Sequence, residues 1–172
     1  TLLLSLALPA TSHSETLALH CGQLFDSATG RSTANQTVVV AEGKVREIRA
    51  GLAAVDGARS VDLTGHTCSP GWIDLQVHLD GQSSPDSYSE GFRLNPEFTV
   101  LRSTGYARKT LMAGFTTVRN LGGGDGVTLA LRDAIAAGKL PGPRIIDAGR
   151  AISTSAGHMD GRLGYREELW SA

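Results

Sequence analysis

Short apolar runs separated by Gly, Asp and Asn fill residues 16–68 of the chain. Runs of this kind, bounded by turn-forming residues, are typical of β-strands joined by hairpins. The runs lie at 17–21, 38–41, 44–48 and 60–64, and the segment 22–30 is rich in turn residues. We therefore predict a small β-sandwich domain over residues 16–68. No pattern of reactive side chains accompanies the strands, so we assign this domain a structural role.

From residue 69 onward, apolar strand-like runs alternate with helical periodicity. Pro96 suits the first turn of a helix, Gly114 a helix end and Asp125 an N-cap. The predicted strands are 71–78, 115–119 and 143–147, the predicted helices are 97–112 and the segment from Val127 to Gly138, and 83–95 is a predicted loop. This alternation indicates parallel β-α units.

The predicted fold class is α/β, with residues 69–172 as the first three strands of a partial (β/α)8 TIM barrel behind the β-sandwich domain. A complete barrel takes eight β-α units and about 250 residues. Three strands alone would leave apolar sheet edges and barrel-facing side chains uncovered. We therefore expect a truncated barrel whose remaining strands belong to a longer protein.

The first fifteen residues differ from the rest, because 1–10 are apolar and uncharged whereas 11–15 are polar. This order resembles the apolar core and cleavage zone of a secretory signal peptide without its basic start. The run is about half of the ~20 residues that a membrane-spanning helix needs. We interpret 1–15 as a signal-peptide remnant of a periplasmic or secreted protein; the alternative is a buried strand or helix start.

Composition narrows the partners of this 172-residue chain. Its formal net charge of −1 and the absence of a Lys or Arg cluster argue against a nucleic-acid surface, and a hydrophobic content of 41% argues against disorder. The chain contains two cysteines, Cys21 and Cys68. An exported protein could pair them, but we expect two small, buried, unpaired residues.

The chemistry-bearing pattern lies on the predicted strand 71–78. Side chains alternate along a strand, so Gln76 and His78 point to the same face, and in a β/α barrel strand ends line the active site. Imidazole nitrogen and carboxamide oxygen can both bind a divalent cation, and imidazole is the better ligand for zinc. We predict a metal site at His78 and Gln76. Asp74 lies deeper on the same face, and we expect it to make a structural hydrogen bond.

The stretch Pro70-Gly-Trp-Ile-Asp-Leu-Gln-Val-His78 resembles the Pro-Gly-x-Ile-Asp-x-His-x-His signature of the amidohydrolase superfamily. The resemblance continues through Gly114-Phe-Thr-Thr-Val-Arg-Asn-Leu-Gly-Gly123 and 142–160, and is greatest for the imidazolonepropionase-related branch, which includes Xaa-Pro dipeptidases. It implies hydrolysis of an amide, cyclic amide or dipeptide C–N bond in a small substrate, with one or two divalent metals, zinc by ligand type. It also implies that His158 lies in a substrate-contacting loop; the alternative is an ordinary surface loop.

The sequence departs from this family at two positions. Gln76 replaces the first His of the signature, and Asn120 replaces an Asp whose role we take as structural. The resemblance also places further metal ligands and a catalytic Asp on later strands, so we expect no catalytic residue in this chain and no activity from it alone. Two rival hypotheses remain: a catalytically degenerate binding or structural protein, which Gln76 favours, and a truncated product without function.

Overall fold

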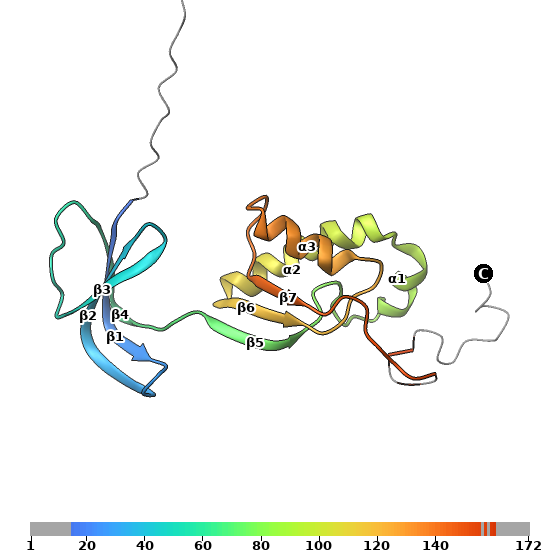
Figure 1. Ribbon diagram of the computed structural model, residues 1–172, viewed down its shortest axis with the longest axis horizontal. Coiled ribbons are helices and arrows are strands. Elements are labelled where there is room, and N and C mark those ends of the chain that lie inside the picture. Colours follow the sequence, from blue (N-terminus) through green and yellow to red (C-terminus); the bar gives the residue numbers. More distant parts are fainter. Residues whose placement is uncertain (1–14, 156, 158, 161–172) are drawn as a thin grey trace, which may run out of the picture. The chain divides into compact units, whose positions relative to one another are not determined.

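A computed structural model describes residues 15–155, 157, 159 and 160 of the chain. The chain divides into two compact units, Thr1–Pro70 and Gly71–Ala172. The described part of the first unit consists of strands, and the second combines strands with helices, as Figure 1 shows. The chain is therefore a mixed α/β protein.

The first unit is a four-stranded sheet in the order β3-β2-β1-β4. Its strands are β1 (Leu17–Asp26), β2 (Arg31–Ala41), β3 (Lys44–Ala50) and β4 (Arg59–Cys68). β2 is antiparallel to both β1 and β3, whereas β1 and β4 run parallel. The β2–β3 hairpin turns through Glu42 and Gly43, which both have positive φ, the conformation that tight two-residue hairpin turns require.

The predicted β-sandwich is not what the described residues form. Their four strands make one continuous sheet, in which β1 is hydrogen-bonded to a neighbour on each edge, rather than two stacked layers. The predicted turn segment is also shorter, because β1 continues to Asp26. At Gly22 an added Cβ would lie 2.0 Å from the Thr64 carbonyl oxygen, so glycine permits the close approach of β4 at this irregular point of the ladder.

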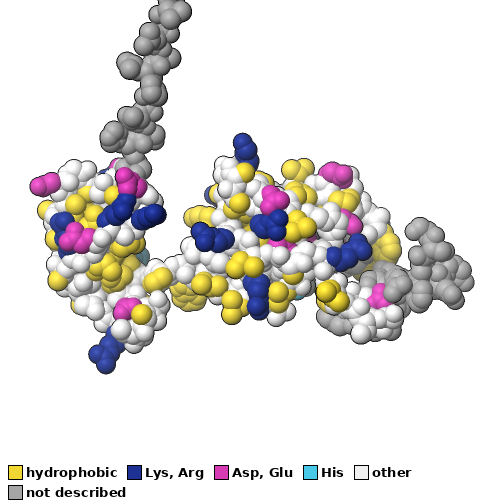
Figure 2. All heavy atoms as spheres, viewed as in Figure 1, with side chains coloured by type: hydrophobic (Ala, Val, Ile, Leu, Met, Phe, Trp, Pro, Cys, Tyr) yellow, Lys and Arg dark blue, Asp and Glu magenta, His cyan; other side chains and the backbone are white. Residues whose placement is uncertain are grey.

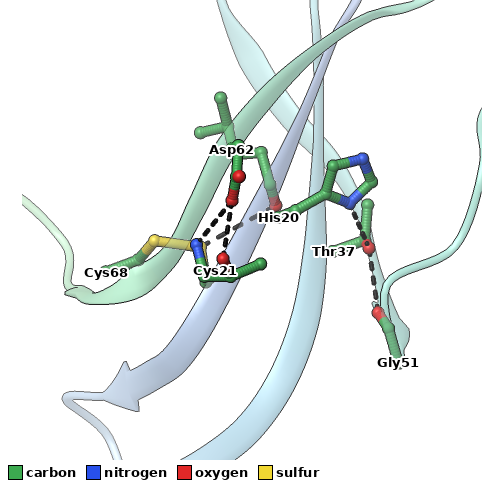
Figure 3. Close-up of a disulfide and its surroundings, with 8 residues drawn as sticks. His20, Cys21, Thr37, Gly51, Asp62 and Cys68 are labelled. Carbon is green, nitrogen blue, oxygen red and sulfur yellow. Dashed lines mark hydrogen bonds between the residues drawn. A yellow bond between two sulfur atoms is a disulfide. The ribbon is translucent and has the colours of Figure 1, made fainter.

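The two cysteines form a disulfide, contrary to our expectation of unpaired thiols (Figure 3). Cys21 lies on β1 and Cys68 ends β4, and these strands are neighbours in the sheet. Their Cα atoms are 5.8 Å apart, within the range that a disulfide spans. The pairing follows from the parallel β1–β4 contact, which joins segments 47 residues apart and which spacing alone does not reveal.

The second unit contains a three-stranded parallel sheet in the order β5-β6-β7. Its elements are β5 (Trp72–Val77), α1 (Ser87–Arg93), α2 (Pro96–Met112), β6 (Phe115–Asn120), α3 (Val127–Ala136) and β7 (Arg144–Asp147). Helices α2 and α3 lie side by side over one face of this sheet (Figure 1). The parallel β-α units predicted from the alternating pattern are therefore present.

The core of the second unit lies between this sheet and the two long helices. Its buried residues are Leu79, Ala107, Val118, Leu131 and Ile145. Asn95 caps α2, because its Oδ1 accepts a hydrogen bond of 2.8 Å from the backbone N–H of Phe98. The predicted N-cap Asp125 is wrong: α3 begins after Gly126, whose φ is +73°, and no side chain caps it.

The predicted loop 83–95 contains the short helix α1. None of its residues is buried. The segment was predicted as a loop because it is rich in Ser, Pro, Asp and Gly. Hydrogen bonds outside the helical ladder support it instead. Arg102 on α2 reaches Glu90 on α1 through an ion pair of 2.6 Å.

The surface of both units mixes apolar and charged side chains, and Figure 2 shows positive and negative groups interspersed on the face in view. Several large apolar side chains of the parallel sheet are more than half exposed: Trp72, Ile73, Leu75 and Ile146. Among the described residues, no helix has the length and apolar character needed to cross a membrane.

Candidate functional site

The candidate site lies where β5 ends. His78 immediately follows the strand and Gln76 is its penultimate residue; both are exposed, whereas Val77 between them packs against the core. Asp74 accepts a hydrogen bond of 3.0 Å from the backbone N–H of Gln76, the structural role expected from the sequence. The strand therefore turns the side chains of Gln76 and His78 away from the helix-covered face.

A backbone carbonyl fixes the ring of His78. Its Nδ1 lies 3.2 Å from the carbonyl oxygen of Gly122, in the loop after β6. A carbonyl oxygen only accepts hydrogen bonds, so Nδ1 must carry the proton. In the neutral imidazole, Nε2 then keeps its lone pair, which is the arrangement that a metal-binding histidine needs.

Two cavities meet at His78. One, of about 620 Å³, is lined by the β6–α3 loop and by residues that follow β7, including Arg150 and Met159. The other, of about 460 Å³, is lined by the segment after β5, by α1 and by the start of α2. His78 and Asp80 line both cavities, whereas Gln76 lines neither. The structure therefore brings one of the two predicted ligands to the cavities.

Arg102 holds the segment after β5 in place. Its Nη1 donates to Glu90 at 2.6 Å and its Nη2 to the backbone oxygen of Asp80 at 3.4 Å. The Arg102 and Glu90 side chains are only 21% and 32% exposed. This tether joins α1, α2 and the residue two positions after His78. No motif in the sequence pointed to Arg102, because its role depends on the fold of 79–94.

The described residues do not assemble a complete metal site. His78 fits one position of such a site, because its Nδ1 is hydrogen-bonded to the Gly122 carbonyl and its Nε2 can serve as the metal ligand. Nevertheless, no group of three or more His, Cys, Asp or Glu side chains suited to a metal occurs among the described residues. A zinc site needs at least three protein ligands, so His78 and Gln76 would supply part of one. His158, the predicted substrate contact, lies outside the described residues.

Solved structures of dipeptidases resemble the chain. A Xaa-Pro dipeptidase crystallised with methionine in its active site is 31% identical, with a TM-score of 0.82, over 90% of this chain and 38% of that one. A prolidase complexed with N-methylphosphonate-L-proline is 28% identical, with a TM-score of 0.70, over 83% of this chain and 34% of that one. The chain thus spans little more than a third of either enzyme.

Sequence comparison leads to the same superfamily. The dihydroorotase of Citrifermentans bemidjiense is 40% identical over 63 residues, which are 37% of this chain and 15% of that enzyme. The profile of the Amidohydrolase family matches residues 67–172, more than half of the chain and all of the second unit's described elements. The resemblance predicted from the motif around His78 is confirmed, and the chain belongs to the amidohydrolase family.

Proposed function

We propose that this chain is the front part of a metal-dependent hydrolase that cleaves a C–N bond in a small substrate. The observation that carries the proposal is the position of His78, which directly follows the first parallel strand and lines both cavities. Its Nδ1 is engaged by the Gly122 carbonyl, which leaves Nε2 as the nitrogen for a metal. In this proposal β5, β6 and β7 are the first three strands of an eight-stranded barrel, whose active site forms at the strand ends.

The proposed substrate is a dipeptide, and the similar solved structures favour one with a C-terminal proline. Two similar structures are a Xaa-Pro dipeptidase and a prolidase, whereas the similar sequences are dihydroorotases. A divalent metal, zinc by ligand type, would activate water and polarise the carbonyl. The 172 residues alone are proposed to be inactive, because the part of the chain that the structure describes does not assemble a complete metal site.

Metal content and hydrolysis of Xaa-Pro dipeptides by the full-length protein test this proposal together. The protein purified with zinc or manganese should hold at least one equivalent, and His78→Ala should lower both metal content and activity by more than tenfold. His66→Ala is the matched control, because His66 is an exposed histidine in the first unit. A wild-type protein without metal and without activity would refute the hydrolase.

Gln76 supports the rival proposal of a binding protein that has lost its chemistry. An amide is a neutral and weaker ligand than the imidazole expected at this position. Gln76→His separates the two proposals. If Gln76 is a lesion, this variant gains metal and activity together; if it is a working variant of the site, the variant gains neither.

Export to the periplasm or the medium is a second part of the proposal. The apolar uncharged start of the chain and the Cys21–Cys68 disulfide both favour an oxidising compartment. In this proposal residues 16–68 form a structural domain and residues 69–172 form the barrel portion. Fractionation of cells that express the full-length protein, with thiol labelling of Cys21 and Cys68, tests export. Cytoplasmic protein with both thiols reactive would refute it.

A further inference from the structure

Asn120 is a buried polar residue that hydrogen-bonds to three segments at the ends of the parallel strands. It is the last residue of β6 and is fully buried. Its Oδ1 accepts from the backbone N–H of Leu79 at 2.9 Å, while its Nδ2 lies 3.0 Å from the Gly122 carbonyl oxygen and 3.4 Å from Oδ1 of Asp147. One amide thereby joins the residue after His78, the loop after β6 and the end of β7.

The orientation of this amide follows from its partners. The N–H of Leu79 only donates, so it must face Oδ1 of Asn120. The carbonyl of Gly122 only accepts, so it must face the NH₂ group. Both contacts require the same orientation, and no flipped amide would satisfy either of them.

The carbonyl of Gly122 links Asn120 to His78. A carbonyl oxygen has two lone pairs, and here one accepts from Asn120 Nδ2 and the other from His78 Nδ1. We propose that Asn120 is a positioning residue: it fixes this carbonyl, which in turn holds His78 in the Nδ1–H tautomer. The inference deepens the proposed function, on which the role of His78 as a ligand rests.

Gly122 is suited to this link. Its φ of +154° favours glycine, and a Cβ there would lie 3.2 Å from the Cβ of Ala151 and 3.7 Å from Cε1 of His78. A side chain at this position would therefore crowd Ala151 and come into van der Waals contact with the ring that the carbonyl holds.

Asp147 explains why the amide, rather than the family's carboxylate, suits position 120. Oδ1 of Asp147 accepts from Asn120 and, at 2.8 Å, from the backbone N–H of Gly149. An aspartate at position 120 would direct a carboxylate oxygen at both the Gly122 carbonyl and Asp147. Like charges at this distance in a buried site are unfavourable. The amide at position 120, where the family pattern has a carboxylate, is thus matched by the carboxylate of Asp147.

The test is the tautomer of His78 in the metal-stripped full-length protein, labelled with ¹⁵N-histidine and observed by NMR at a pH at which free imidazole is neutral. The His78→Gln variant identifies the signals of His78. We expect one neutral species protonated at Nδ1 in the wild type. Asn120→Asp should abolish this single signature, because the Gly122 carbonyl loses its donor and turns away. Asp147→Asn keeps an oxygen facing Asn120 and should retain it.

A second variant keeps the test decisive if Asn120→Asp does not fold. The double variant Asn120→Asp/Asp147→Asn removes the carboxylate pair but still gives Gly122 no donor, so it should fold and still lack the signature. Ser103→Ala, which removes a buried hydroxyl of α2 outside this network, controls for general destabilisation. The inference is overturned if the double variant retains the wild-type tautomer. Because no metal or activity is measured, this result is independent of whether the hydrolase proposal holds.

Discussion

In the described part of each unit, a fully buried polar residue joins segments that are distant in sequence: Thr37 in the first unit and Asn120 in the second. Thr37 Oγ1 donates to the Gly51 carbonyl at 2.9 Å (Figure 3). It accepts from the N–H of Ala53 at 2.9 Å. Because its proton is used on Gly51, Nδ1 of His20, 3.1 Å away, must be the donor in that contact.

The two residues use the same physical device for different ends. Thr37 ties β2 to the loop after β3, and it lines neither of the described cavities. Asn120 ties together backbone that adjoins the cavities and, through Gly122, orients a cavity-lining imidazole. A buried hydrogen-bond centre is thus not itself a sign of function. A buried hydrogen-bond centre contributes to function only where the groups that it orients line a site.

The largest effect we predict is the loss of stability of the first unit when its disulfide is reduced. The Cys21–Cys68 disulfide closes a loop of 47 residues, which in the chain-entropy treatment corresponds to about 4 kcal/mol of stability. Reduction should therefore greatly increase amide hydrogen exchange in β1 and β4, as measured by mass spectrometry. The double variant Cys21→Ala/Cys68→Ala is the control and should not respond to reductant. Unchanged exchange after reduction would show that the bridge adds no stability.

The second unit has no disulfide among its described residues and depends on packing. Leu131 on α3 is fully buried in its core, so Leu131→Ala should destabilise the unit by about 3 kcal/mol, measured by urea unfolding. Leu101→Ala is the matched control, because Leu101 on α2 is 70% exposed and should change stability by less than about 0.5 kcal/mol. Equal effects of the two substitutions would contradict the core assignment.

Thr37→Val tests the buried centre of the first unit. Valine keeps the shape but leaves the Gly51 carbonyl, the Ala53 N–H and His20 without their partner, at an expected cost of about 2 kcal/mol. Thr33→Val on the same strand is the control, because Thr33 is exposed. Urea unfolding of both variants measures the difference. Equal stability of the two variants would mean that solvent replaces the lost bonds.

The sequence predicted best those elements whose evidence is local. The apolar runs before His78 and within β6, and the periodic face of α3, are sufficient to place parallel β-α units. The polar first half of β2 was missed, because pairing with β1 makes it a strand. Helix α1 was missed because its segment is rich in Ser, Pro, Asp and Gly, a composition typical of loops.

The candidate site shows the same limit. His78 was recognisable from residue type, strand position and motif. The hydrogen bonds of Asn120 and the tether of Arg102 were not, because their partners lie up to 41 residues away in the chain. The disulfide depends likewise on which strands become neighbours. Motifs identify the groups that carry chemistry, but the groups that orient them emerge from the fold.

The smallest predicted effect concerns the stability of the first unit in acid. Hydrogen bonds from the Thr64 backbone and hydroxyl lower the pKa of Asp62, and those from the Thr29 hydroxyl and Ala28 backbone lower the pKa of Asp26. Both carboxylates belong to the first unit. A folded-state pKa below the unfolded value contributes stability above the unfolded pKa, and that stability is lost as pH falls through the folded pKa.

Acidification below about pH 4 should therefore cost the first unit stability through these two groups. Asp62→Asn removes one of them, so the variant should lose less stability than the wild type between neutral pH and about pH 3. Asp56→Asn, an exposed aspartate of the same unit, controls for the loss of one charge. Urea unfolding followed in β1 and β4 gives the measurement. Parallel acid profiles for wild type and Asp62→Asn would mean that the Thr64 contacts persist in the unfolded chain, since a shift common to both states cancels.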